Sequence, residues 1–223
     1  MKKSIFVILA MIPLVLSSCA SSKFFSQRAS DLRPIAIVEP YAYITDAVGD
    51  WSTKYLDDAS RLNQKLVAEI VASMELPIEK TVAMEYHSEQ SAQTDAWMRR
   101  LGDINAGAAR ELEIPEAIRE AVRKSGCRYG LLITDLGYLK DPDGYAFEKA
   151  LDTGMRVLDA VLNNEISLDS DAEAYLNGVY ALVFDSTTGK VAWYGAQPRR
   201  YKKSPVDHRT LSEQLQALFK DFR

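Results

Sequence analysis

Arg128-Tyr129-Gly130-Leu131-Leu132-Ile133 is the stretch of sequence that decides the fold. It opens the segment Arg128 to Leu139, and its unbroken apolar run is typical of a strand that is buried on both faces. Ile35-Ala36-Ile37-Val38 is a second run of this kind, and Glu79 to Tyr86 predicts another strand. Tyr175 to Phe184 and Val191 to Gln197 alternate apolar side chains around the turn residues 185–190, which predicts an antiparallel hairpin.

Amphipathic segments lie between and after these strands. Thr53 to Met74 repeats apolar residues at helical spacing, Pro115 and Gly126 bracket a short helix, and Glu89 to Leu112 is helix-like. Tyr145 to Leu162 also has helical periodicity, and a capping box of Thr210 and Glu213 predicts the start of a last helix. This alternation predicts an α/β protein with a mixed β-sheet flanked by helices, a C-terminal antiparallel hairpin and a final amphipathic helix.

The composition is that of an ordinary globular domain. The chain has 223 residues, of which 47% are hydrophobic and 26% charged, and its net charge is −4. Residues 1–18 hold Lys2 and Lys3 and no acidic residue, so the remainder carries 25 basic against 31 acidic residues, a net charge of −6. This acidic balance argues against bulk nucleic-acid binding, and the length suits a single packed core.

The N-terminus resembles the signal peptide of a bacterial lipoprotein. Lys2-Lys3 precedes the apolar run Ile5 to Leu16, and Leu16-Ser17-Ser18-Cys19 matches the lipobox of that family. The apolar run is shorter than the roughly 20 residues that a membrane span needs. The resemblance implies that Cys19 becomes the first residue of the processed chain and carries acyl chains such as palmitate. Cleavage of an ordinary secretory peptide without lipidation remains the alternative.

This resemblance sets the expected organisation and location of the chain. We expect a signal peptide over residues 1–18, a lipidated N-terminus and flexible tether over 19–32, and one domain over 33–223. Ala20 stands where enterobacterial lipoproteins retained in the inner membrane carry Asp, which favours the outer membrane. Ser21-Ser22-Lys23 lacks the acidic cluster that some bacteria use for surface display. We therefore expect the domain to face the periplasm.

The order of elements is also similar to that of a known group of periplasmic lipoproteins. The likeness is carried by residues 34–38, by the strand that starts at Cys127, and by the hairpin Val183 to Trp193. These segments resemble lipoproteins of the curli-secretion channel and peptidoglycan-synthase activator type. The channel needs membrane-spanning β-hairpins, whereas Tyr145 to Leu162 has helical periodicity. The resemblance therefore implies an accessory or assembly role and no pore.

Few residues of the sequence suggest chemistry. Glu85 and Glu89 flank His87 at a spacing that could place three metal ligands on one side of a strand, but a solvated strand end explains them better. His208 beside Asp207 fits a polar pair at a helix start, and Cys127 fits a small buried hydrophobe. Asp141 and Asp143 fit a turn. No common hydrolase, nucleotide or metalloprotease motif is present, so we expect no catalytic residue, cofactor or metal.

Two surface features could bind partners. The basic segment Arg199, Arg200, Tyr201, Lys202 and Lys203 could contact an anionic surface, although a solvated connection is the simpler interpretation. Tyr41 and Tyr43, with Trp51 nearby, could form an interaction surface or pack into the core.

These observations favour a membrane-anchored envelope lipoprotein that binds another envelope protein without catalysis. The alternative is a small-molecule or glycan-binding lipoprotein with a deep pocket lined by residues such as Trp51, Trp97 or Trp193. An envelope hydrolase is the third interpretation, and it lacks a recognisable nucleophile. The expected partners are the membrane, through the lipid on Cys19, and an envelope protein, and not nucleic acid.

Overall fold

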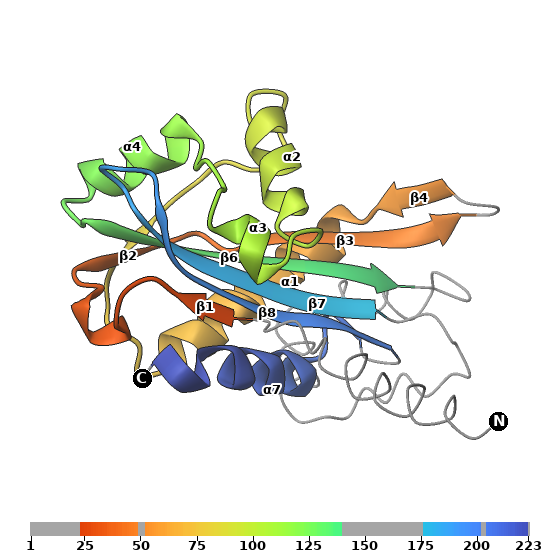
Figure 1. The fold of residues 1–223 in the computed structure, drawn as a ribbon. Coiled ribbons are helices and arrows are strands. Elements are labelled where there is room, and N and C mark those ends of the chain that lie inside the picture. The colour runs from red at the N-terminus through yellow and green to blue at the C-terminus, as the bar shows by residue number, and fades with distance from the viewer. Residues whose placement is uncertain (1–22, 49–51, 140–175, 202–203, 223) are drawn as a thin grey trace, which may run out of the picture.

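The computed structural model describes residues 23–48, 52–139, 176–201 and 204–222. Cys19, the turn at Asp141 and Asp143, and the helix predicted over Tyr145 to Leu162 lie outside these residues. The described residues form one α/β domain around an open mixed sheet of eight strands (Figure 1). The strands are β1 (Lys23–Phe25), β2 (Ile35–Val38), β3 (Tyr41–Val48), β4 (Ser52–Tyr55), β5 (Ile78–Val82), β6 (Tyr129–Leu139), β7 (Leu176–Asp185) and β8 (Val191–Tyr201).

The central strand of the sheet is β6, the segment that the sequence marks as buried. On one side β6 pairs antiparallel with β7, from Tyr129 opposite Asp185 to Tyr138 opposite Leu176. On the other side it pairs in parallel first with β2 and then with β3. The strand order is β1-β8-β7-β6-β2-β5, and β4 pairs with β3 as an antiparallel hairpin beside this path.

A break at Glu39 and Pro40 divides one side of β6 between β2 and β3. Proline has no N–H to give to a ladder, so the strand is interrupted there. Glu39 instead donates its N–H to the Val82 carbonyl (2.8 Å), while its own carbonyl accepts from the Tyr86 hydroxyl (2.8 Å). The break thus ties the chain that follows β5 to the start of β3.

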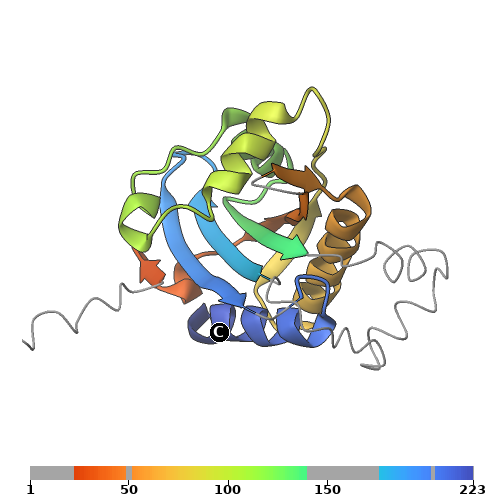
Figure 2. The same cartoon turned by 90° about the vertical axis from the view of Figure 1, so that its right-hand side faces the viewer.

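Helices cover both faces of the sheet, which gives three layers (Figure 2). The helices α1 (Asp57–Ser73) and α7 (His208–Phe219) lie on one face. The helices α2 (Ala92–Arg100), α3 (Ala106–Ala109) and α4 (Glu116–Lys124) lie on the other. Two short 3-10 turns, η2 (Ala29–Asp31) and η3 (Lys220–Phe222), complete the described elements. None of the helices described is long and apolar enough to cross a membrane.

Alternate side chains of β6 enter the two halves of the core. Leu131 and Ile133 pack on the side of α1 and α7, whereas Leu132 and Leu136 pack on the side of α2 and α4. Gly130 directly precedes Leu131, and a Cβ there would come within 2.4 Å of the Phe184 ring. Both faces of the strand are thus covered, which explains why its apolar run is continuous. The sequence predicts this burial on both faces.

The structure confirms the predicted fold class and moves several boundaries. Tyr55, which the periodicity assigned to the first helix, belongs to β4, and α1 begins at Asp57. The helix-like region after Glu89 is broken into α2 and α3. The capping box predicted at Thr210 is wrong, because the Asp207 carboxylate caps α7 by accepting from the Thr210 N–H (2.9 Å). An acidic N-cap one turn earlier thus starts the helix.

The predicted tether is wrong for the residues from Lys23 onward. Lys23 to Phe25 form β1, which pairs antiparallel with β8, and Leu32 is fully buried in the core. Phe24 is buried on the face that carries α3. The composition of this stretch is polar, but its few apolar residues are placed to pack against the sheet edge.

A buried polar network joins the sheet to α1 and α7. Asn63 of α1 donates its side-chain N–H groups to the Asp135 carboxyl group of β6 (2.8 Å) and to the Pro205 carbonyl. Asn177 of β7 donates to Gln214 of α7 (2.8 Å). Asp135 is fully buried, and this burial raises its pKa to about 8, although the hydrogen bond from Asn63 opposes the shift.

We predict that Asp135→Asn stabilises the protein at pH 8 and much less at pH 5. The folded chain holds the Asp135 proton up to about pH 8, whereas the usual pKa of 3.8 applies after unfolding. The contribution of Asp135 to the free energy of unfolding is therefore fully present below pH 4. It is lost as the pH rises toward 8, and the loss amounts to several kcal/mol. Thermal unfolding at both pH values measures the effect. Asp103→Asn, in an exposed turn, is the control, and an equal change in both variants would contradict the prediction.

Candidate functional site

Five aromatic side chains gather where β3, β4 and the chain after β5 meet. We call Tyr41, Tyr43, Tyr55, Tyr86 and His87 the tyrosine–histidine cluster. The His87 ring lies 4.8 Å from the Tyr55 ring and 5.1 Å from the Tyr41 ring between centroids. Tyr43 stacks on Tyr55 at 5.1 Å, and Tyr86 meets Tyr41 edge-on at 5.1 Å. Such contacts stabilise the arrangement beyond the area that the aromatic rings bury.

Strand register brings the tyrosines together. Tyr41 and Tyr43 lie two residues apart on β3 and therefore share one face. Tyr55 of β4 pairs with Thr45, which places it diagonally opposite Tyr43. The hydroxyl of Ser60 fastens the start of α1 to this hairpin, because it accepts from the Ile44 N–H (3.0 Å) and donates to the Leu56 carbonyl (2.8 Å).

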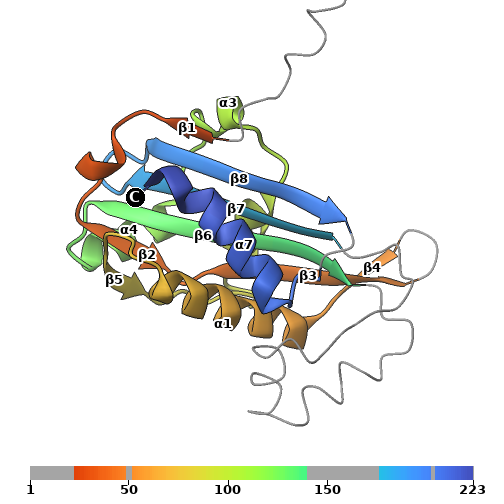
Figure 3. The ribbon, with the colours of Figure 1, turned by 90° about the horizontal axis from the view of Figure 1, so that it is seen from below.

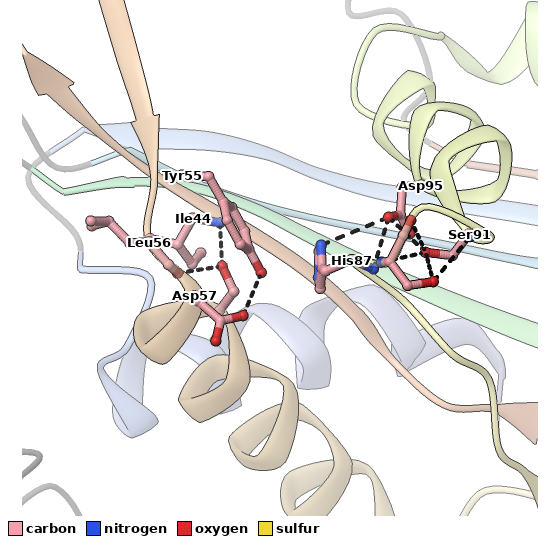
Figure 4. Close-up of polar contacts among 9 residues, drawn as sticks. Ile44, Tyr55, Leu56, Asp57, His87, Ser91 and Asp95 are labelled. Atoms are coloured by element: carbon pink, nitrogen blue, oxygen red, sulfur yellow. Dashed lines mark hydrogen bonds and ion pairs between the residues drawn. The ribbon is translucent and has the colours of Figure 1, made fainter.

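His87 has an unusual backbone conformation that neighbouring polar groups hold in place. Its φ is +61°, in the left-handed region that residues other than glycine rarely adopt. The His87 N–H donates to the carboxylate of Asp95 in α2 (2.8 Å), and the Ser91 hydroxyl donates to the same oxygen (3.1 Å) (Figure 4). A left-handed residue of this kind persists only where its surroundings impose it, and such residues concentrate at functional sites.

Burial and nearby charges set the electrostatics of the cluster. Burial lowers the pKa of His87, while the carboxylates of Asp95 and Asp57 partly offset the shift. The imidazole is therefore neutral at pH 7. Burial also raises the pKa of Tyr41 and of Tyr86, so both phenols stay protonated. Neither phenol is therefore activated as a nucleophile.

Part of the cluster faces solvent and part is buried. Tyr41 is only 1% exposed, and within the described chain its hydroxyl has no hydrogen-bond partner. Tyr43, Tyr55 and His87 are half-buried. The Arg99 guanidinium of α2 lies 4.7 Å from the centroid of the Tyr43 ring. Tyr41 thus follows the core-packing interpretation of the sequence, whereas Tyr43 contributes to a surface.

A second feature is a hollow of about 450 Å³ beside β1, which we call the β1 hollow. Its walls are formed by Phe24 to Gln27, by the start of β8 and by three basic residues, Arg110, Arg128 and Lys190. Arg128 also pairs with the Asp185 carboxylate (2.9 Å). Burial by itself would raise the pKa of Asp185. Hydrogen bonds from the Thr188 N–H, Arg128 and the Thr187 N–H outweigh this effect, so the pKa lies below its usual value.

Two of the three tryptophans expected to line a ligand pocket, Trp97 and Trp193, do not line this hollow. Trp193 is fully buried against Phe219 and Phe222. Trp97 donates its indole N–H to the Glu113 carbonyl (2.9 Å), and Trp51 lies outside the described residues. The hollow instead collects residues from the N-terminal strand that the sequence predicted as a tether.

The other predicted residues have separate positions. Cys127 is buried, as expected, and His208 begins α7 next to its Asp207 cap. Glu85 and Glu89 are exposed, and no group of three His, Cys, Asp or Glu side chains within the described residues is arranged to hold a metal.

The structure describes the basic segment only in part. Arg199 and Arg200 belong to the end of β8, and only their backbone is described. Cys19, Lys202 and Lys203 lie outside the described residues. Contact of this segment with an anionic surface therefore stays a prediction.

Comparisons with known proteins find similarity only among solved structures. No family model matches the chain, and no curated protein matches it in sequence. The chain is similar to a PelC dodecamer structure from Paraburkholderia phytofirmans, with 10% identity, a TM-score of 0.41, and coverage of 89% of this chain and 94% of that one. A PelC variant from the same organism gives 9% identity, the same TM-score, and coverage of 90% and 96%. Similarity at this level does not identify a family.

We predict that His87 titrates below pH 6.5 and that Asp95→Asn lowers its pKa further. Burial disfavours the imidazolium, and the Asp95 carboxylate is the largest influence that opposes this effect. The asparagine keeps an oxygen that can accept from the His87 N–H, so the variant removes mainly the charge. Proton NMR of the two histidines, assigned with His208→Gln, measures both values. A His87 pKa at or above 6.5, or a rise in Asp95→Asn, would contradict this description of the site.

Proposed function

We propose that this protein is a membrane-anchored lipoprotein of the bacterial envelope that binds another envelope protein and catalyses no reaction. The lipobox residues at Cys19 support the anchor, and Ala20 favours the outer membrane with the domain facing the periplasm. Each buried CH₂ of an acyl chain contributes about 0.8 kcal/mol, so two or three chains hold a domain of this size durably.

The tyrosine–histidine cluster is the observation that carries the binding proposal. One of its half-buried rings, that of Tyr43, lies against Arg99, and tyrosine and arginine are enriched at the centres of protein interfaces. The rings are already held by stacking and by the Asp95 hydrogen bonds, so a partner would not have to order them. Preformed contact residues lower the entropic cost of association.

Binding of a small molecule or glycan is the second function that an observation favours. The β1 hollow, at about 450 Å³, falls within the size range of ligand pockets, roughly 300–1,000 Å³. Its basic lining would suit an anionic ligand. A soluble ligand would protect the hollow, whereas a protein partner would protect the tyrosine–histidine cluster.

We predict that Cys19→Ala releases the protein from the membrane. In cells labelled with an alkyne analogue of palmitate, the unaltered protein should carry the label and remain in the membrane fraction after a high-pH wash. The variant should lose both the label and membrane retention, because no acyl chain is attached. Cys127→Ala is the matched control, since that thiol is buried, and retention of Cys19→Ala would mean that the anchor lies elsewhere.

We predict that a photo-crosslinking residue at Glu89 captures an envelope protein in intact cells, whereas one at Glu120 of α4 does not. Both positions are exposed, but only Glu89 is close in the chain to His87. Tyr55→Ala should reduce the Glu89 adduct at least about tenfold, because alanine at an interface centre costs roughly 2 kcal/mol or more. Circular dichroism would verify folding. Equal adducts at both positions, or an adduct unchanged by Tyr55→Ala, would contradict the proposed surface.

A further inference from the structure

The first described residues are held firmly at the edge of the sheet. Lys23 pairs with Gly195 and Phe25 pairs with Trp193 in the β1–β8 ladder. Ser26 extends this contact, because its N–H donates to the Ala192 carbonyl (2.8 Å). The Lys23 ammonium donates to the Ala217 carbonyl of α7 (2.9 Å). The chain is therefore fixed to the domain from Lys23 onward.

This attachment limits the distance between the domain and any lipid on Cys19. Only four residue steps separate Cys19 from Lys23, and a fully extended chain spans at most about 3.6 Å per residue. The start of β1 can thus lie no more than about 14 Å from the acylated residue. A thirteen-residue flexible tether would leave the orientation of the domain free, whereas this short link brings the β1 edge to the membrane surface.

The β1 edge is basic, although the chain as a whole is acidic. Arg110, Arg128 and Lys190 line the β1 hollow with one carboxylate, Asp185, which already pairs with Arg128. Two of these cations are held over aromatic rings, since Arg110 lies 5.0 Å from the Phe24 centroid and Arg128 lies 5.1 Å from the Tyr129 centroid. The hollow therefore has an excess of positive charge at fixed positions.

Phe25 adds an apolar contact next to these charges. It is 39% exposed and is the one exposed large hydrophobic side chain among the residues described. It also lines the β1 hollow. Exposed aromatic rings beside basic groups are typical of proteins that lie in the membrane interface, where the ring enters the acyl boundary and the cations meet phosphates.

We infer that the β1 edge lies against the membrane, with a lipid headgroup phosphate bound in the β1 hollow by Arg110, Arg128 and Lys190 and with the Phe25 ring in the interface. The inference rests on the proposed lipidation of Cys19. It assigns the hollow to an anionic phospholipid and leaves the tyrosine–histidine cluster available to a protein partner. Figure 3 shows β1 and β5 at opposite edges of the sheet, so in this orientation the β5 edge would face away from the bilayer.

Depth-dependent quenching of the lipidated full-length protein tests this orientation. A single fluorescent label is attached at Phe25→Cys, or at Gln27→Cys as a second position if the first variant unfolds. The matched control is Glu79→Cys on β5, exposed and about 24 Å across the sheet from β1, at roughly 4.8 Å for each of five strand steps. The proteins are reconstituted in vesicles of phosphatidylglycerol with brominated acyl chains. We expect at least about twofold stronger quenching at the β1 position than at position 79.

Charge reversal then tests the phosphate contact. Arg110→Glu and Lys190→Glu should each reduce quenching at the β1 position, since loss of one basic group weakens an anionic membrane contact by roughly fivefold. Phosphatidylcholine vesicles without anionic lipid should give the same reduction. Glu120→Lys on α4 is the control and should leave the quenching unchanged.

The outcomes separate this inference from the proposed function. Protein that floats with the vesicles but is quenched equally at both edges would overturn the inference and leave the anchor intact. Quenching that is unchanged by both charge reversals and by the charge of the lipid would overturn the headgroup site. Protein that carries no lipid and does not float would overturn the proposed anchor and the inference with it. Protection of the hollow by free inorganic phosphate without vesicles would assign it to a soluble anion and overturn the membrane contact.

Discussion

The hydrogen-bonded ladder on both sides of β6 is the constraint on which the rest of the structure depends. Helices cover both faces of this strand, so its backbone groups cannot reach water and must be paired within the sheet. The ladder with β7 fixes the C-terminal hairpin, and the parallel ladders with β2 and β3 fix the N-terminal half of the chain. The helices α1 to α4 are then placed by the connections that they make between strands, and α7 follows β8.

The interruption of the second ladder at Glu39 and Pro40 creates the candidate site. Since β2 ends there and β3 begins, the chain after β5 can cross the sheet edge and bond to Glu39. This crossing brings His87 between Tyr41 and Tyr55, and α2 holds it there through Asp95. The left-handed backbone of His87 is the local cost of this arrangement, which α2 and the surrounding rings offset.

The position of β1 changes how the proposed anchor would act. A long flexible tether would only concentrate the domain near a surface. A strand that pairs with β8 four residues after Cys19 would also orient the domain, because the edge of the sheet cannot move far from the lipid. With the proposed anchor, an oriented domain would present the tyrosine–histidine cluster in a defined direction relative to the membrane.

The sequence by itself determined the layered α/β class, the buried strand at Tyr129 to Ile133, the hairpin around residues 185–190 and the burial of Cys127, because each depends on local periodicity or turn chemistry. For the candidate site, the sequence showed only which residue types lie near one strand, such as Tyr41 and Tyr43, and not which side chains they contact. Tertiary structure decided the pairing of β1 with β8, the assignment of Tyr55 to β4, the Asp207 cap and the meeting of His87 with the tyrosines. These features join segments far apart in the chain or choose between locally equivalent patterns, and only the packed sheet supplies the contacts that make one choice more stable than another.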